Sequence, residues 1–163
     1  MLNTSAIIAE LNNAFGVASA TRGCPQRGAL SPTLWSLVAD ELIVKLNESG
    51  YLTHSYAHDI VATISGKFPG IIGELAQNAL NIISKWCVEK ELSVNPSKTT
   101  VIPFTRKRKL EGLDNLSLFG QQLQLSKNLK YLGVMLDSKL TWNSHMEYIF
   151  KKPRICYMPA KGP

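Results

Sequence analysis

Two side chains that can form a functional site, His58 and Asp59, are neighbours near the middle of the sequence. They close the stretch Tyr56-Ala57-His58-Asp59, and a β-branched apolar run begins directly after it at Ile60. This pattern predicts a tight β-hairpin over residues 51–64 that carries an imidazole and a carboxylate at its tip. We take this tip as the candidate active site.

Two other kinds of site do not fit this tip. His54 and His58 are four residues apart, which suits chelation on a helix, but on a strand four residues span about 13 Å and the rings cannot share one ion. A Ser/His/Asp arrangement has no support, because the sequence contains no nucleophile-elbow motif. Cys24, Cys87 and Cys156 are scattered without a CxxC pair. This argues against a zinc site and a disulfide framework, and favours a reducing compartment.

A loop that can approach a ligand closely is predicted upstream, over residues 21–28, where two glycines and a proline occur together. Ser31 is a suitable N-cap for the helix that follows. Arg22, Gln26 and Arg27 are therefore expected on a loop at a helix N-terminus, where phosphate and carbonyl groups are readily bound. An ordinary loop–helix junction explains the same spacing.

The remaining elements would position these residues. Apolar spacing predicts helices over residues 1–20, over 31–50 with Leu34, Leu37, Val38, Leu42 and Leu46 buried, over about 71–90, and beginning within 140–150. Short strands are predicted over residues 99–104, 116–120, 121–125 and 130–136. Residues 153–163 have little periodicity and are predicted to be disordered. Helices and hairpins that alternate irregularly indicate an α+β fold and not a doubly wound sheet.

Composition is compatible with one basic domain. The chain has 163 residues, of which 45% are hydrophobic, and 18 Lys and Arg against 12 Asp and Glu give a formal charge of +6. This excess permits a polyanionic partner such as nucleic acid, although many basic proteins bind none. The run Arg106–Lys109 is either a solvated loop or a phosphate contact. No apolar run approaches membrane-spanning length, so we expect an intracellular chain, in the cytoplasm or the nucleus.

Four blocks together resemble the reverse transcriptases of non-LTR retrotransposons, the jockey-like elements. The blocks are Gly23–Pro32, Tyr56–Asp59, Leu92–Thr99 and Lys130–Val134, and their order and approximate spacing agree with the family. The resemblance implies a partial polymerase palm, made of antiparallel hairpins packed on helices, with the start of a thumb over residues 21–152. The fingers would be missing, and residues 1–20 would form a helix outside the match.

What the resemblance implies is RNA-directed DNA synthesis, with an RNA template and a DNA primer as partners; the absence of a long apolar run independently argues against a membrane. The primer hydroxyl attacks a deoxynucleotide with the help of two magnesium ions held by carboxylates. Asp59 matches the second carboxylate of the family's Tyr-x-Asp-Asp hairpin and would be a metal ligand, and His58 stands where the first should be. Lys98 matches a lysine near the triphosphate. Tyr131 and Gly133 match a hairpin that supports the primer.

The loop Gln26-Arg27-Gly28 matches the segment that contacts the incoming nucleotide and the template. Arg27 stands where the family usually has a glycine, so a long cation could obstruct the template path or bind phosphate. Two further departures concern the metal ligands. A neutral imidazole at position 58 supplies neither the charge nor the bridging geometry that magnesium prefers. The family's upstream aspartate has no counterpart, because residues 1–22 contain no Asp and their one acidic residue is Glu10.

The sequence therefore predicts a fragment of a reverse transcriptase that is inactive on its own. Two other interpretations stay open. The first is a module that binds nucleic acid without catalysis, which the basic charge favours. The second is the product of a decayed element with no selected role, which the out-of-pattern tail favours.

Overall fold

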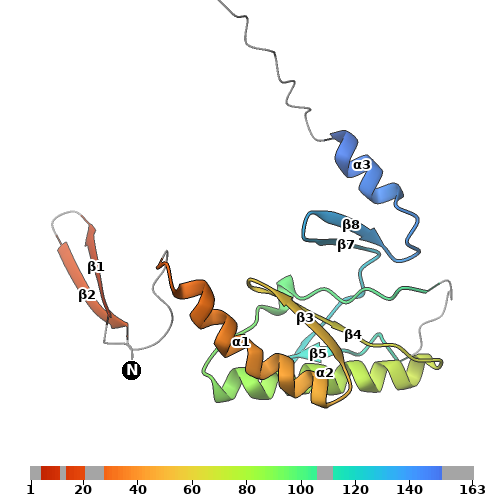
Figure 1. The fold of residues 1–163 in the computed structure, drawn as a ribbon, viewed down its shortest axis with the longest axis horizontal. Helices are drawn as coiled ribbons and strands as arrows, with labels where there is room; N and C mark the ends of the chain where they lie inside the picture. Colours follow the sequence, from red (N-terminus) through yellow and green to blue (C-terminus); the bar gives the residue numbers. More distant parts are fainter. Residues whose placement is uncertain (1–4, 12–13, 21–27, 106–111, 152–163) are drawn as a thin grey trace, which may run out of the picture. The chain divides into compact units, whose positions relative to one another are not determined.

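The computed structural model describes residues 5–11, 14–20, 28–105 and 112–151 (Figure 1). Two compact units make up the chain, Met1–Thr63 and Ile64–Pro163. Each described element of these units is a helix, a 3-10 turn or a strand of a two-stranded antiparallel hairpin. The predicted α+β class is confirmed.

The first unit begins with a hairpin and not with the predicted helix. Strand β1 (Ser5–Leu11) pairs antiparallel with β2 (Ala14–Ala20), from Ser5 opposite Ala20 to Leu11 opposite Ala14. The helix prediction over residues 1–20 was wrong because an apolar run that also fits helical spacing can equally form a strand. The pair Asn12-Asn13, a residue type common in turns, separates the two runs in the sequence.

Helix α1 (Ser31–Glu48) follows where a helix was predicted, and Pro32 lies in its first turn. The predicted N-cap was wrong, since the capping position is Leu30, which has no side-chain cap. The helix buries Ala39, Leu42 and Leu46, whereas Leu37 of the predicted apolar stripe is 67% exposed. Burial along α1 is therefore narrower than the apolar spacing suggested.

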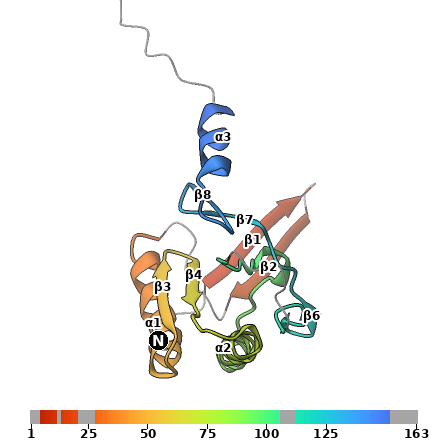
Figure 2. The same cartoon turned by 90° about the vertical axis from the view of Figure 1, so that its right-hand side faces the viewer.

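Gly50 ends helix α1 and directs the chain into the next hairpin. Its φ of 87° lies in the left-handed region, its N–H donates to the Asn47 carbonyl, and the Tyr51 N–H donates to the Leu46 carbonyl. These two bonds form a Schellman motif. Strands β3 (Leu52–Tyr56) and β4 (Asp59–Thr63) follow as an antiparallel pair. The Asn47 side chain accepts a hydrogen bond from the Thr53 N–H at 3.0 Å, which ties β3 to α1. Figure 2 shows strand β3 alongside helix α1.

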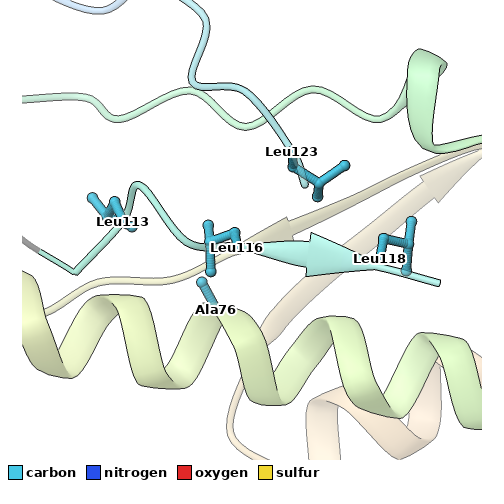
Figure 3. Packing of buried hydrophobic residues seen from close by; sticks show 5 residues of the cluster. All are labelled: Ala76, Leu113, Leu116, Leu118 and Leu123. Carbon is cyan, nitrogen blue, oxygen red and sulfur yellow. The ribbon is translucent and has the colours of Figure 1, made fainter. Parts of the chain in front are cut away.

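The core of the second unit lies against helix α2 (Pro69–Glu89), which the sequence predicted. Its cluster of buried side chains is Ala76, Leu113, Leu116, Leu118 and Leu123. In Figure 3, Leu116 points toward Ala76 of the helix. Strand β5 (Ser117–Leu118) is also held by Gln77, whose side chain accepts from the Ser117 N–H at 2.9 Å and donates to its carbonyl at 3.1 Å.

Strand β6 (Gln121–Gln122) pairs with β5, so the predicted hairpin around Gly120 is confirmed in a shorter form. The predicted strand over residues 99–104 was wrong. After a 3-10 turn η1 (Pro96–Lys98), this segment makes one isolated bridge, between Val101 and Leu125. A proline at position 103 cannot donate a ladder hydrogen bond, which limits pairing there.

Strand β7 (Asn128–Tyr131) pairs with β8 (Val134–Asp137), and helix α3 (Asn143–Lys151) follows as predicted. The single strand predicted over residues 130–136 was wrong, because Leu132 and Gly133 form a turn with φ values of 47° and 85°. The predicted disorder of residues 153–163 lies outside the described residues. None of the helices in the described ranges is long and apolar enough to cross a membrane.

Candidate active-site hairpin

The predicted hairpin with His58 and Asp59 at its tip is confirmed. The β3–β4 ladder runs from Leu52 opposite Thr63 to Tyr56 opposite Asp59, which leaves Ala57 and His58 as the two turn residues. All four residues of the tip are exposed, and the Tyr56 side chain is 64% exposed. The imidazole and the carboxylate therefore stand at the end of a rigid ladder and face solvent.

Helix α1 fixes the conformation of this tip through Trp35. The Trp35 indole Nε1 donates to the Ala57 carbonyl at 2.8 Å. Its ring also packs against the His58 imidazole, with centroids 5.4 Å apart and planes tilted by 55°. Ala57 adopts a φ of 50°, which is costly for a residue with a Cβ. The contacts from Trp35 offset part of that cost and orient the histidine ring.

Sequence reasoning gave Trp35 no role, because it follows Leu34 and lies beside the predicted apolar stripe of α1. A signal was available in its chemistry. A tryptophan on a half-buried helical position carries an N–H that usually finds an acceptor. Which acceptor it finds is a tertiary fact, since Trp35 and Ala57 are 22 residues apart.

The donor set at the tip does not fit a pair of magnesium ions. Two-metal catalysis needs several carboxylate oxygens that bridge and charge-balance the two cations. The tip supplies one carboxylate, from Asp59, and its neighbour is an imidazole. Within the residues that the structure describes, no group of three or more His, Cys, Asp or Glu side chains is placed to hold a metal. No catalytic step through magnesium follows from these residues.

Other predicted site residues are only partly described. Gln26 and Arg27 lie outside the described residues. The Gly28 carbonyl accepts a hydrogen bond from the Ser31 N–H at 3.1 Å, immediately before α1. Lys98 ends the 3-10 turn η1 with an exposed side chain, and the Asn95 carboxamide that accepts from the Ser97 N–H at 2.9 Å caps this turn.

Tyr131 and Gly133, the predicted primer-support residues, lie at the tip of the β7–β8 hairpin. Tyr131 is half-buried and pairs with Val134, while Gly133 is exposed. The structure thus brings these two residues together, as it does His58 and Asp59. Tyr131 and Gly133 belong to the second unit, and His58 and Asp59 belong to the first.

Comparison with known proteins identifies the family. The family model for "Reverse transcriptase (RNA-dependent DNA polymerase)" matches residues 2–136. The chain belongs to the reverse transcriptase family. Because the match begins at residue 2, the β1–β2 hairpin lies within the matched range, and the expectation that residues 1–20 fall outside it is corrected.

The reverse transcriptase chain is similar to several proteins of insect retrotransposons. It is 26% identical over 129 residues to the Pol polyprotein of type-1 retrotransposable element R1 from Bradysia coprophila, covering 79% of this chain and 13% of the relative. It is 28% identical over 129 residues to the RNA-directed DNA polymerase from mobile element jockey of Drosophila funebris, covering 76% and 14%.

A third relative is the probable RNA-directed DNA polymerase from transposon BS of Drosophila melanogaster. It is 28% identical over 153 residues, which cover 90% of this chain and 17% of the relative. The matched parts thus span between 13% and 17% of the length of these three relatives. The resemblance to non-LTR retrotransposon reverse transcriptases is confirmed. No solved structure matches the chain.

Proposed function

We propose that this chain is a segment of a non-LTR reverse transcriptase, comprising the later palm and the start of the thumb, and that it does not synthesise DNA on its own. The observation that carries the proposal is the β3–β4 tip, which presents the Asp59 carboxylate beside the His58 imidazole. The family match supports the polymerase origin, and the donor chemistry of the tip supports the inactivity.

The physical reason is charge. Two magnesium ions bring four positive charges to within a few ångströms of each other, and oxygen anions of the protein have to offset their repulsion. A neutral imidazole in place of one carboxylate removes a bridging anion and offers a softer ligand that magnesium disfavours. Residues 1–39 contain no Asp, so they hold no counterpart of the family's upstream aspartate.

The other predicted residues have supporting roles in this proposal. The Gln26-Arg27-Gly28 loop would contact nucleotide and template, Lys98 the triphosphate, and the tip of the β7–β8 hairpin, with Tyr131 and Gly133, the primer. Magnesium would be the ion of the complete enzyme, with Asp59 as one ligand. RNA template and DNA primer would be the partners.

Primer extension on an RNA template tests the proposal. The purified chain is incubated with a labelled DNA primer, deoxynucleotides and magnesium, and compared with Asp59→Ala. Asp40→Ala, which removes an exposed carboxylate from helix α1, is the matched control. We expect no incorporation above the no-protein background in all three. Incorporation that persists in Asp40→Ala and disappears in Asp59→Ala would refute the claim of inactivity.

A second candidate function is nucleic-acid binding without catalysis, and the net charge of +6 favours it. Binding through lysine and arginine releases counterions from the phosphates, so the affinity should fall steeply as the salt concentration rises. Titration of a labelled primer–template duplex at several salt concentrations measures this slope. A flat salt response, or no binding at low salt, would remove this candidate.

A further inference from the structure

The turn between strand β8 and helix α3 presents an exposed tryptophan in an unusual backbone conformation. Trp142 has a φ of 66°, and Leu140, two residues earlier, has a φ of 53°. Both values lie in the left-handed region, which is unfavourable for a residue with a bulky side chain. The Trp142 side chain is nevertheless 51% exposed, so burial of the indole does not account for the conformation.

The carboxylate of Asp137 holds this turn in place. Its Oδ1 accepts from the backbone N–H groups of Lys139 at 3.1 Å and Thr141 at 3.0 Å. Its Oδ2 accepts from the Thr141 hydroxyl at 3.2 Å and from the Trp142 N–H at 2.9 Å. Four donors on one carboxylate over-determine the path of the backbone, which is how a strained conformation persists. The backbone from which the indole projects is thus held by the Asp137 carboxylate.

Two further rings support the indole along helix α3. The Trp142 and His145 rings meet edge to face with centroids 6.0 Å apart, and His145 stacks on Tyr148 at 6.5 Å. The Met135 N–H donates to His145 Nδ1 at 3.2 Å, and the Lys130 ammonium lies 4.9 Å from the centre of the Tyr148 ring. The rings are therefore anchored to the β7–β8 hairpin, and Trp142 is the exposed end of the series.

The surroundings of Trp142 are basic. The Ser138 N–H donates to the Lys127 carbonyl at 2.9 Å, so Lys127 and Lys139 flank the same end of the hairpin, and both side chains are exposed. The Ser144 hydroxyl bonds to the Asn128 side chain at 3.1 Å, which places the start of α3 at that end as well. Residues 127–151 contain two acidic side chains: the Asp137 oxygens accept hydrogen bonds from the turn, and Glu147 forms an ion pair with Lys151 at 3.9 Å.

We propose that Trp142 is a base-stacking residue for single-stranded nucleic acid, that Lys127 and Lys139 contact the adjacent phosphates, and that Asp137 is a positioning residue for the indole. An exposed aromatic ring at a hairpin end that also carries two exposed lysines complements a base and its phosphates. The inference rests on the proposed function only in requiring nucleic acid as a partner, and it does not depend on catalysis.

Fluorescence anisotropy of a labelled oligothymidylate with the full chain tests the stacking. Trp142→Ala should weaken binding by about tenfold, within the range found for loss of one base–aromatic stack. Trp142→Phe keeps an aromatic face and should recover most of that loss. Phe150→Ala is the matched control, because Phe150 is a 71% exposed aromatic on helix α3, which follows Trp142, and it lies outside the ring series. It should bind like the unchanged chain.

A strand of the same length with abasic sites separates stacking from charge. The unchanged chain should bind the abasic strand about as weakly as Trp142→Ala binds oligothymidylate. Trp142→Ala should bind the abasic strand and oligothymidylate with equal affinity. Asp137→Asn alone should weaken binding to oligothymidylate. In the double variant with Trp142→Ala it should cause no further loss of affinity. A purely structural role of Asp137 would make the two effects add.

Three results would overturn the inference. They are equal affinity of Trp142→Ala and the unchanged chain for oligothymidylate, equal affinity of the unchanged chain for intact and abasic strands, and no binding at low salt. The second comparison needs no variant, so it decides the matter even if Trp142→Ala fails to fold. Primer extension is measured separately. Deoxynucleotide incorporation would therefore refute the claim of inactivity without bearing on Trp142.

Discussion

Trp35 shows how one side chain can determine the geometry of a candidate site without belonging to it. Trp35 connects helix α1 to the turn of the β3–β4 hairpin. Its indole donates a 2.8 Å hydrogen bond to the Ala57 carbonyl, and its ring contacts His58. These two contacts hold the tip against helix α1.

We predict that Trp35→Phe destabilises the hairpin by about 0.5–1.5 kcal/mol, the usual net value of one hydrogen bond. The ring contact with His58 is largely kept, while the donor to the Ala57 carbonyl is removed. Urea unfolding measures the change. Leu37→Ala is the control, because Leu37 is on the same helix and 67% exposed, so its truncation should be nearly neutral. Equal stability of Trp35→Phe and the unchanged chain would show that the tip does not depend on the indole.

The sequence predicted the roles of residues whose contacts are local. It did not predict the roles of residues whose contacts are distant along the chain. His58 and Asp59 could be placed on a hairpin tip because the turn and its flanking strands are local. The role of Trp35 could not be predicted, since it depends on a contact across 22 residues. Trp142 was also missed, because its backbone conformation is set by the Asp137 carboxylate and not by any local preference of tryptophan.

Among the helices, α1 and α2 end in the same way with different residues. Helix α1 places Gly50 at the left-handed position after its cap, and α2 places Glu91 there with a φ of 53°. In α2 the Glu91 N–H donates to the Val88 carbonyl and the Leu92 N–H to the Cys87 carbonyl, which completes a second Schellman motif. The second helix thus carries a backbone strain that the first avoids.

Substitutions at these two positions should have opposite effects. Glu91→Gly should stabilise the chain by about 1 kcal/mol, and Gly50→Ala should destabilise it by about 1–2 kcal/mol, because a Cβ is unfavourable in this conformation. A Cβ at Gly50 would meet no atom within 4 Å, so strain and not a clash would cause the loss. Thermal unfolding checks both. As a control, Gly70→Ala, within helix α2 and equally open, should not destabilise.

The stability that Asp137 gives to the turn before helix α3 should decrease at acidic pH. The backbone N–H of Thr141 is the main cause that lowers the pKa of Asp137, and bonds from Lys139 and Trp142 add to it. A carboxyl group with a lowered pKa in the folded state stabilises that state above its unfolded pKa of about 3.9. This contribution is lost as the pH falls through the folded pKa.

The stability advantage of the unchanged chain over Asp137→Asn should therefore be constant at neutral pH and should shrink below about pH 4. Urea unfolding of both proteins at a series of pH values measures it. A difference between the two proteins that does not change across this range would contradict the assigned role of the carboxylate.

The bounds of helices and strands could be predicted where the element is long and where a proline or glycine marks its end. Helices α1 and α2 are long, with a proline in the first turn of each, and were predicted within a few residues. Residues 1–20 and 130–136 were misjudged, because a short apolar run fits more than one structure and a Leu132-Gly133 turn is a weak signal. The resemblance to the family had implied a hairpin at Tyr131 and Gly133, and on that point it was the better guide.

For the whole molecule, family membership and activity rest on different observations. The family match extends over residues 2–136, whereas the matched part of each of the three relatives described above is under a fifth of its length. Polymerase chemistry depends on a few carboxylates, and they can be lost while the surrounding fold is kept. We therefore attribute the proposed inactivity of this chain to missing carboxylate ligands and not to a missing fold.

The variant His58→Asp tests this central claim most directly, because it places two neighbouring carboxylates at the hairpin tip and leaves the Trp35 hydrogen bond to the Ala57 carbonyl in place. Primer extension on an RNA template with magnesium is the measurement, with circular dichroism to confirm that the variant is folded. We predict no incorporation above background, since residues 1–22 supply no further aspartate. Template-directed synthesis by this single variant would contradict the account.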